Sequence, residues 1–252
     1  MRLKAVVFDM GDTLILTDRW DYDKSLRKLL QSLQRDNVVV SVPFEDFKQV
    51  YFEVRNQMYR KSEPSLEEVD FRFRVAETLK KFNYDLSHES TVVANAVEGF
   101  VDAFIEDSRM EDYVPSILAR LKERYKLGMV SNFAYAPGLR RALRHFHITP
   151  FFDAIVISGE LGFRKPHQRI FEEALAALAV RADEVVFVGD SLKADVYGAK
   201  EAGFKTVLVE NVGLRKNPFA IPGELDPFPV QPDFTIACLA NLPEVLSALQ
   251  SS

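Results

Sequence analysis

The sequence predicts an α/β protein with a doubly wound parallel sheet and a separate, mostly helical region inserted after the first strand. From Tyr113 onward, short apolar runs alternate with helical patterns, as in strands joined by right-handed helical crossovers. Between about residues 15 and 110, helical patterns instead follow one another with few strand signals. With 252 residues, 47% of them apolar, the chain can form one domain with a large insertion or two small domains.

The first strand is predicted within residues 4–14. Residues 6–8 are Val, Val and Phe without polar alternation, which suits a strand buried on both faces of a sheet covered by helices. Asp9 follows in a turn that contains Gly11, so it lies at the carboxyl edge of the sheet, where open α/β sheets bind ligands. Asp9 could there attack phosphorus or hold a cation. Taken alone, it could equally end the strand and cap the next segment.

Four helices are predicted between residues 15 and 110, because apolar residues recur there at steps of three and four. The apolar faces occupy residues 26–33, 44–54, 71–79 and 92–104. Ser65 and Glu68 look like a capping box that opens the third of these helices. Residues 38–42 are apolar enough for a strand, but Pro43 then begins a helix, so we expect a connection there.

The remainder of the chain supplies the other strands of the sheet. Strands are expected at 127–131, 154–158, 185–189, 205–209 and 234–237, and helices at 117–121, 139–146, 170–178 and 195–202. Gly203 is a plausible left-handed cap for the helix that precedes it. A proline-rich loop is expected at about 211–232. The sequence has no internal repeat and no low-complexity tract.

Polar groups follow four of these segments in a fixed order. The four motifs are Asp9 with Thr13, Ser131 with Asn132, Lys165 with Pro166, and Gly189, Asp190 and Ser191 with Asp195. With these motifs, nearly the whole chain resembles the haloacid dehalogenase superfamily of hydrolases. The resemblance implies a Rossmann-like catalytic core at 1–15 and 111–252, and a helical cap domain at 16–110 that lies over the catalytic edge.

The resemblance also implies an activity, that of a Mg²⁺-dependent phosphatase acting on a small phosphorylated metabolite through an aspartyl-phosphate on Asp9. Mg²⁺, which prefers oxygen ligands, would be held by Asp9 and Asp190. Asp195 would hold a metal-bound water or orient Lys165, which balances the aspartates. The expected phosphate-binding residues are Thr13, Ser131, Asn132 and Lys165. These parts match what phosphoryl transfer needs: a nucleophile in line, a cation and fixed donors.

Position 11 departs from the family pattern. Phosphatases of the superfamily usually carry there a second Asp that protonates the leaving group, but this chain has Gly11, with Asp12 one place later. The family's metal uses the backbone carbonyl at this position, which Gly11 still provides, so Mg²⁺ binding should survive. Acid–base help is usually worth about 10²–10⁴-fold. Asp12 could reach in to give that help as a catalytic residue, or it could point elsewhere.

Two other functions stay open. A metal-free dehalogenase of the same superfamily would have no reason to keep the carboxylate of Asp190, and the Tyr expected at position 11 is missing. The chain could also be a phosphate-binding or regulatory protein that lost turnover together with its general acid. This non-enzyme hypothesis includes a receiver-like phosphoacceptor, although receivers lack a large cap. Without the motifs, Lys165 would pass for a surface lysine, Ser131 with Asn132 for a turn, and Asp195 for a helix cap.

Composition bounds the partners and the compartment. The net charge of −5 argues against nucleic acid as a partner. No apolar stretch approaches the roughly 20 residues of a membrane helix, and the N-terminus lacks the features of a signal peptide, so we expect a cytoplasmic protein. The single cysteine, Cys238, excludes an intrachain disulfide and is expected to be a buried, inert thiol. No role is assigned to Trp20, Arg19, Arg55, Arg60, Arg72 or Arg74, although cap residues can contact substrate.

Overall fold

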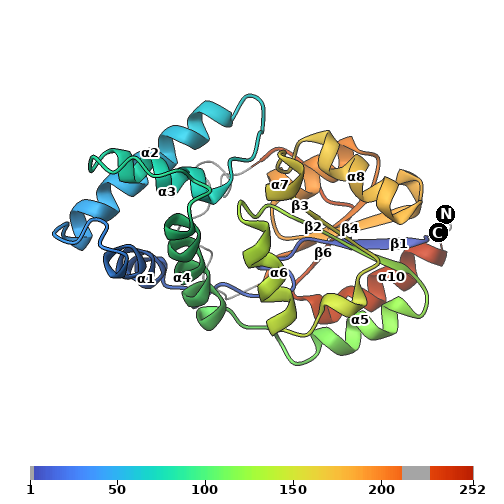
Figure 1. Ribbon diagram of the computed structural model, residues 1–252. Coiled ribbons are helices and arrows are strands. Elements are labelled where there is room, and N and C mark those ends of the chain that lie inside the picture. The colour runs from blue at the N-terminus through green and yellow to red at the C-terminus, as the bar shows by residue number, and fades with distance from the viewer. Residues whose placement is uncertain (1–2, 212–227, 252) are drawn as a thin grey trace.

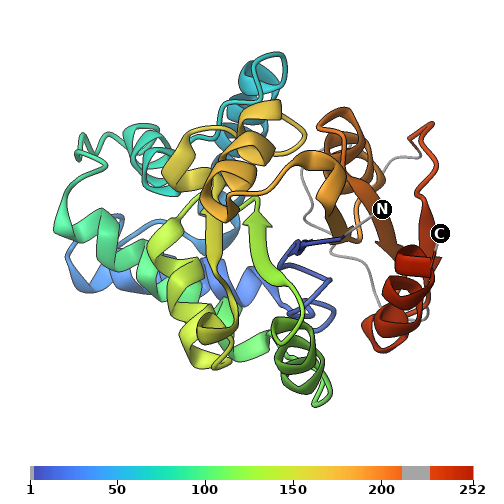
Figure 2. The same ribbon diagram turned by 90° about the vertical axis from the view of Figure 1, so that its right-hand side faces the viewer.

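A computed structural model describes residues 3–211 and 228–251, and its centre is a six-stranded parallel sheet in the order β3-β2-β1-β4-β5-β6 (Figures 1 and 2). The strands are β1 (Ala5–Phe8), β2 (Lys126–Ser131), β3 (Ala154–Ile157), β4 (Val185–Gly189), β5 (Lys205–Val209) and β6 (Phe234–Ile236). β1 lies between β2 and β4, so the strand order reverses beside it. Such a reversal is where open α/β sheets bind ligands.

The sheet is buried on both faces, as the uninterrupted apolar runs predict. All four residues of β1 are buried; Val6 and Phe8 contribute to the core on one face, and Ala5 and Val7 to the core on the other. In Figure 1, α8 lies above the sheet and α5 and α10 lie below it. The doubly wound α/β fold is therefore confirmed.

Six helices flank the sheet in the described chain. They are α5 (Val114–Lys122), α6 (Ala136–His145), α7 (Ser158–Leu161), α8 (Gln168–Leu178), α9 (Gly198–Glu201) and α10 (Leu242–Ser251). The helix expected at 195–202 begins earlier, with a π-helical segment, Leu192–Tyr197, that continues into α9. Ser191 caps this segment, so Asp195 lies inside it and is not its cap. Gly203 adopts the left-handed conformation expected of it, with φ +86°.

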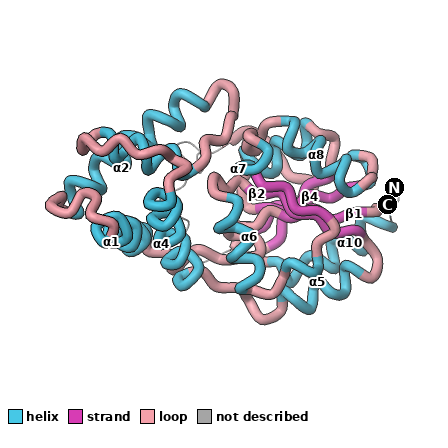
Figure 3. Tube along the Cα trace, viewed as in Figure 1, coloured by secondary structure: helices cyan, strands magenta, loops and turns pink. Residues whose placement is uncertain are grey.

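The helical region contains α1 (Tyr22–Arg35), α2 (Phe44–Ser62), α3 (Phe71–Lys80) and α4 (Thr91–Asp107). Figure 3 shows it beside the carboxyl edge of the sheet, with helices and loops but no labelled strand. The two chain segments that join it to the sheet run together, because the backbones of Leu16 and Arg109 exchange hydrogen bonds of 2.7 and 3.0 Å. This pairing is close to the boundaries that we expect for a cap at 16–110. Residues 38–42 form a connection, as predicted.

Two local predictions are wrong. The capping box of Ser65 and Glu68 does not form: Asp70 caps α3 by accepting a hydrogen bond from the backbone N–H of Arg72 at 2.8 Å. The backbone around Glu68 is instead paired with the loop before Lys165, since the Glu68 N–H donates to the carbonyl of Gly162 at 2.9 Å. Tertiary pairing thus outweighs a local capping pattern.

The second correction concerns Cys238, which is only half-buried, with its thiol 3.6 Å from the side-chain oxygen of Asn241. Cys238 lies after the end of β6 and directly before a 3-10 helix, Leu239–Asn241, so it is not part of the buried face of the sheet. The loop expected at 211–232 falls mostly outside the described residues. None of the helices within residues 3–211 and 228–251 is long and apolar enough to span a bilayer.

Candidate active site

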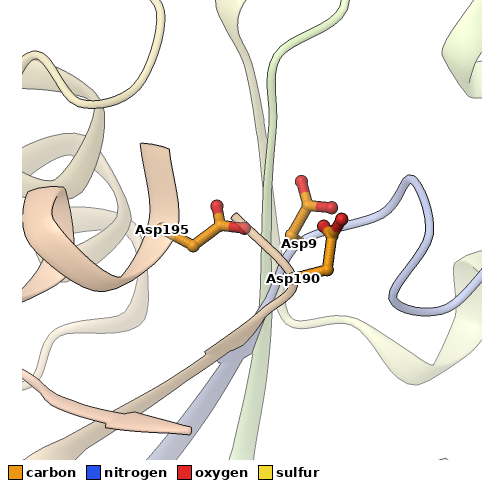
Figure 4. A group of neighbouring side chains, drawn as sticks. All are labelled: Asp9, Asp190 and Asp195. Carbon is orange, nitrogen blue, oxygen red and sulfur yellow. The ribbon is translucent and has the colours of Figure 1, made fainter. Parts of the chain in front are cut away.

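Three aspartates meet at the carboxyl edge of the sheet (Figure 4). Asp9 follows β1, Asp190 follows β4, and Asp195 comes from the π-helical segment. One carboxylate oxygen from each lies within 4.8 Å of the other two. Asp9 and Asp190 lie close together because β1 and β4 are neighbouring parallel strands. Their register pairs Phe8 with Val188, so the residues after both strands lie at the same edge. Hard oxygen ligands at this spacing could hold Mg²⁺.

Lys165 lies among these carboxylates and is almost completely buried. Its ammonium group donates to Asp9 Oδ1 at 2.6 Å, to Asp195 Oδ1 at 2.7 Å and to the carbonyl of Val130 at 2.9 Å. Burial opposes its charge, but Asp195 and Asp9 outweigh that cost and raise the pKa of Lys165 above its ordinary value. Lys165 is therefore a charged, fully bonded group of the site and not a solvated surface lysine.

Asp9 is buried at the centre of the group. Burial raises its pKa from 3.8 to about 7, because a low-dielectric environment disfavours the carboxylate; Lys165 opposes this shift and Asp195 adds to it. The buried carboxylates of Asp9 and Asp195 share one ammonium group, so this pair carries excess negative charge when both are ionised. A cation bound among the three aspartates would offset that charge.

Asp195 is held from both sides. Its Oδ1 accepts from Lys165, and its Oδ2 accepts the backbone N–H of Ser191 at 3.0 Å. The close approach requires glycine at position 189, because a Cβ there would lie 2.3 Å from Asp195 Oδ2. The end of β4 is therefore shaped to seat this carboxylate.

The side chain of Asn132 links the end of β2 to the loop that carries Lys165. Its side-chain oxygen accepts the backbone N–H of Lys165 at 2.7 Å, and its amide group donates to the Lys165 carbonyl at 3.1 Å. Ser131 and Asn132 both line the cavity in front of Asp9. Since its side-chain amide is used to hold the loop, the backbone N–H of Asn132 is the better candidate for a phosphate donor.

The turn after β1 contains the other predicted site residues. Thr13 is buried, with its hydroxyl 3.5 Å from Asp190 Oδ1, and is not among the residues that line the cavity. Asp12, at φ +51°, directs its carboxylate to Thr17, accepting from the backbone N–H at 2.7 Å and from the hydroxyl at 2.8 Å. Burial raises the pKa of Asp12, while the Thr17 hydrogen bonds oppose the shift. Gly11 lines the cavity, and a Cβ on it would meet nothing within 4 Å.

A cavity of about 240 Å³ lies between these residues and the helical region. Pockets for drug-sized ligands measure about 300–1,000 Å³, so this one fits a smaller molecule. Of the residues left unassigned from the sequence, Trp20, Arg55 and Arg74 line it, whereas Arg19, Arg60 and Arg72 do not.

Sequence reasoning missed three residues of this region. Tyr59 and Glu68 line the cavity, and Glu68 accepts a hydrogen bond from the Ser158 hydroxyl at 2.8 Å. Arg164 is buried beside Lys165 and donates to the Ser62 hydroxyl at 3.0 Å, which links the active-site loop to α2. Its position next to the Lys165 motif was the available signal, but nothing in the sequence indicated its burial.

The chain matches known proteins over most of its length. Residues 3–203 match the sequence profile of the haloacid dehalogenase-like hydrolases. A glyceraldehyde 3-phosphate phosphatase of Pyrococcus abyssi is 29% identical over 206 residues, which are 81% of this chain and 80% of that protein. A phosphoserine phosphatase of Thermus thermophilus is 35% identical over 125 residues, 48% of this chain and 50% of its own.

Solved structures support the fold. The crystal structure of a 2-haloacid dehalogenase from Pseudomonas syringae pv. Tomato has a TM-score of 0.70 at 23% identity, covering 98% of this chain and 99% of that one. At this level of identity, the similarity concerns the arrangement of the sheet and the helices.

Proposed function

Because the chain belongs to the haloacid dehalogenase-like hydrolase family, we propose that it is a Mg²⁺-dependent phosphatase of a small phosphorylated metabolite. The observation that carries the proposal is the group formed by buried Asp9, Asp195 and Lys165 with partly buried Asp190 at one end of a small cavity. Similar proteins named as phosphatases of glyceraldehyde 3-phosphate and phosphoserine support the same reaction class.

The residues present fit Mg²⁺. Asp9 and Asp190 offer carboxylate oxygens at the edge of the cavity, and Gly11 offers a backbone carbonyl beside them. We assign Asp195 to orienting Lys165, because both of its oxygens already accept hydrogen bonds. Bound there, Mg²⁺ would neutralise charge on the phosphate and on the aspartates.

Asp9 acts as the nucleophile. Lys165 holds Oδ1, so Oδ2 is the oxygen that attacks phosphorus. A bond forms between Oδ2 and phosphorus while the ester bond from phosphorus to the leaving oxygen breaks, and the leaving oxygen takes up a proton. Water then attacks phosphorus, which releases inorganic phosphate and restores the Asp9 carboxylate. The Ser131 hydroxyl and the Asn132 backbone N–H are the proposed donors to the phosphate oxygens.

The residues assigned so far include no acid that would protonate the leaving group. Gly11 supplies no acid, and both Asp12 oxygens accept hydrogen bonds from Thr17. We therefore assign Asp12 to holding the turn, and expect the enzyme to favour esters whose leaving groups need little protonation.

Hydrolysis of para-nitrophenyl phosphate with Mg²⁺ and with EDTA tests the proposal, and 2-chloropropionate tests the dehalogenase alternative. We expect phosphate release that stops with EDTA and returns with Mg²⁺, and no chloride release. Chloride release that EDTA does not affect would assign the chain to the dehalogenases. Absence of both reactions would favour the non-catalytic alternative.

A further inference from the structure

The helical side of the cavity contains two buried arginines. Arg55 on α2 and Arg74 on α3 are 6% and 7% exposed, and both line the cavity. Arginine stays charged at every pH at which proteins fold. A buried charge is costly unless something compensates it, so the groups around the Arg74 guanidinium show whether the chain compensates its charge.

The hydrogen-bond partners of Arg74 within the described chain are uncharged. Its Nη1 donates to the hydroxyl of Tyr51 at 3.2 Å and its Nη2 to the hydroxyl of Tyr59 at 3.0 Å. Burial raises the pKa of Tyr59, which keeps that phenol neutral. The guanidinium also lies over the ring of Phe71, 5.1 Å from its centroid. Its Nε is buried and has no hydrogen-bond partner in residues 3–211 and 228–251.

Among the described residues, Glu68 is the acidic side chain that lines the helical side of the cavity, and it makes no hydrogen bond or ion pair with Arg74. The charge of Arg74 acts on Glu68 only through space, where it opposes the rise of the Glu68 pKa that burial causes. The Glu68 Oε2 accepts from Ser158, and its Oε1 is buried without a partner among the described residues. The Glu68 carboxylate is thus held by Ser158 and not by Arg74. The core side has the opposite composition, with several aspartates around Lys165.

Neighbouring cations of the same region are compensated within the chain. Lys165 pairs with Asp9 and Asp195, Arg164 lies 3.3 Å from Glu63, and Arg72 lies 2.8 Å from Asp70. Arg74 has no such ion pair with any residue that the structure describes. An anionic group in the cavity would supply what the chain does not.

We propose that the substrate carries a second anionic group, a carboxylate or a second phosphate, which binds beside Arg74 while the phosphate to be cleaved lies at Asp9. This inference rests on the proposed phosphatase activity and adds the substrate class. The cavity of about 240 Å³ suits a short spacer between the two groups. The substrate is therefore a phosphate ester of a small hydroxy acid, or a small bisphosphate.

A structural role for Arg74 makes a different prediction. If Arg74 only ties α2 to α3 through Tyr51 and Tyr59, its loss lowers stability and affects all substrates alike. If Arg74 binds the second anion, its loss removes a preference between two substrates that differ only in that group. The ratio of two kcat/KM values therefore separates the roles.

The experiment compares matched esters in the presence of Mg²⁺. 3-Phosphoglycerate and glycerol 3-phosphate differ in a carboxylate against a hydroxymethyl group; propane-1,3-diol bisphosphate and 3-hydroxypropyl phosphate differ in the second phosphate. We expect wild type to prefer one anionic member by about tenfold or more in kcat/KM, as for a charge-assisted contact. The pair in which wild type shows the preference tells whether the second anion is a carboxylate or a phosphate.

Arg74→Met should remove most of that preference, and Arg74→Lys should keep part of it. Arg72→Met is the matched control: Arg72 is two residues away on α3, pairs with Asp70 and does not line the cavity, so the preference should persist. Equal kcat/KM within both pairs in wild type, or a preference that Arg74→Met leaves unchanged, would overturn the subsite. Activity on the esters that lack the second anion would still support the proposed phosphatase.

Binding tests the subsite even if no ester is hydrolysed, an outcome that would count against the proposed function alone. Calorimetry on wild type and Arg74→Met with 3-phosphoglycerate, glycerol 3-phosphate and the second pair gives the dissociation constants. Tighter binding of one anionic member that depends on Arg74 supports the subsite. Equal binding of both members of each pair contradicts it.

Discussion

The two sides of the cavity hold their charges differently. On the core side, Lys165 makes three hydrogen bonds, two of them to carboxylates that need it in turn. On the helical side, Arg74 donates to neutral phenols, and its Nε has no hydrogen-bond partner in the part of the chain that the structure describes. The charged groups of the core side therefore depend on one another, whereas the helical side, as we propose, binds the second anionic group of the substrate.

The largest effect should come from the core side. Asp9→Asn keeps the size of the side chain but removes the attacking carboxylate, so turnover should fall by roughly 10³-fold or more. Steady-state hydrolysis of para-nitrophenyl phosphate measures the loss, and the circular dichroism spectrum should be unchanged. If the purified variant kept most of the wild-type rate, Asp9 would not be the nucleophile.

The second-largest difference between the two sides should be in the free energy of unfolding. Lys165→Met leaves buried carboxylates without their cation, which typically costs about 3–5 kcal/mol of unfolding free energy. Arg74→Met leaves only phenol groups without a donor, so we expect about 2 kcal/mol or less. Urea unfolding of both variants at one pH provides the comparison. Equal losses would show that Arg74 is as integrated into the fold as Lys165.

Metal binding gives a smaller effect. Asp190→Ala removes one of two protein carboxylates proposed for Mg²⁺, so the half-saturating Mg²⁺ concentration should rise by about tenfold or more. A titration of activity against Mg²⁺ measures this shift. An unchanged titration would remove Asp190 from the metal site.

The smallest expected effect is a gain at Gly11. Its surroundings have room for a side chain, and Gly11→Asp would place a carboxylate where related phosphatases carry their acid. Alkyl phosphates should then gain about tenfold, and aryl phosphates less, because an alkoxide needs the proton more. The slope of log(kcat/KM) against leaving-group pKa measures the difference.

Asp12→Asn is the control for that gain. If Asp12 is already the acid, Asp12→Asn should slow alkyl esters selectively and Gly11→Asp should add little. A slope that neither substitution alters would mean that water or another residue supplies the proton.

The core side could be predicted largely from the sequence. Asp9 and Asp190 each follow an uninterrupted apolar run, and parallel strands bring such positions to one edge. The place of Lys165 as the charge that balances the aspartates was expected from the family resemblance that the motifs carry. The use of the Asn132 side chain to hold the Lys165 loop was not, because an amide in a turn has several possible partners.

The helical side could be predicted only as a set of helices. Arg72 and Arg74 lie two residues apart on α3, yet one pairs with Asp70 and the other lines the cavity. Helical periodicity shows which residues share a face, but not which neighbour that face meets. Glu68 illustrates the same limit. The sequence pattern predicted a helix cap, but the Glu68 backbone instead pairs with the loop before Lys165.

Direct trapping of the covalent intermediate tests the central claim. Borohydride reduces an aspartyl-phosphate to homoserine, so wild type quenched with borohydride during turnover of para-nitrophenyl phosphate should contain homoserine at position 9, found by peptide mass spectrometry. The modification should be absent without substrate and in Asp9→Asn. Turnover with homoserine at another aspartate, or with none, would contradict the assignment of Asp9 as the nucleophile.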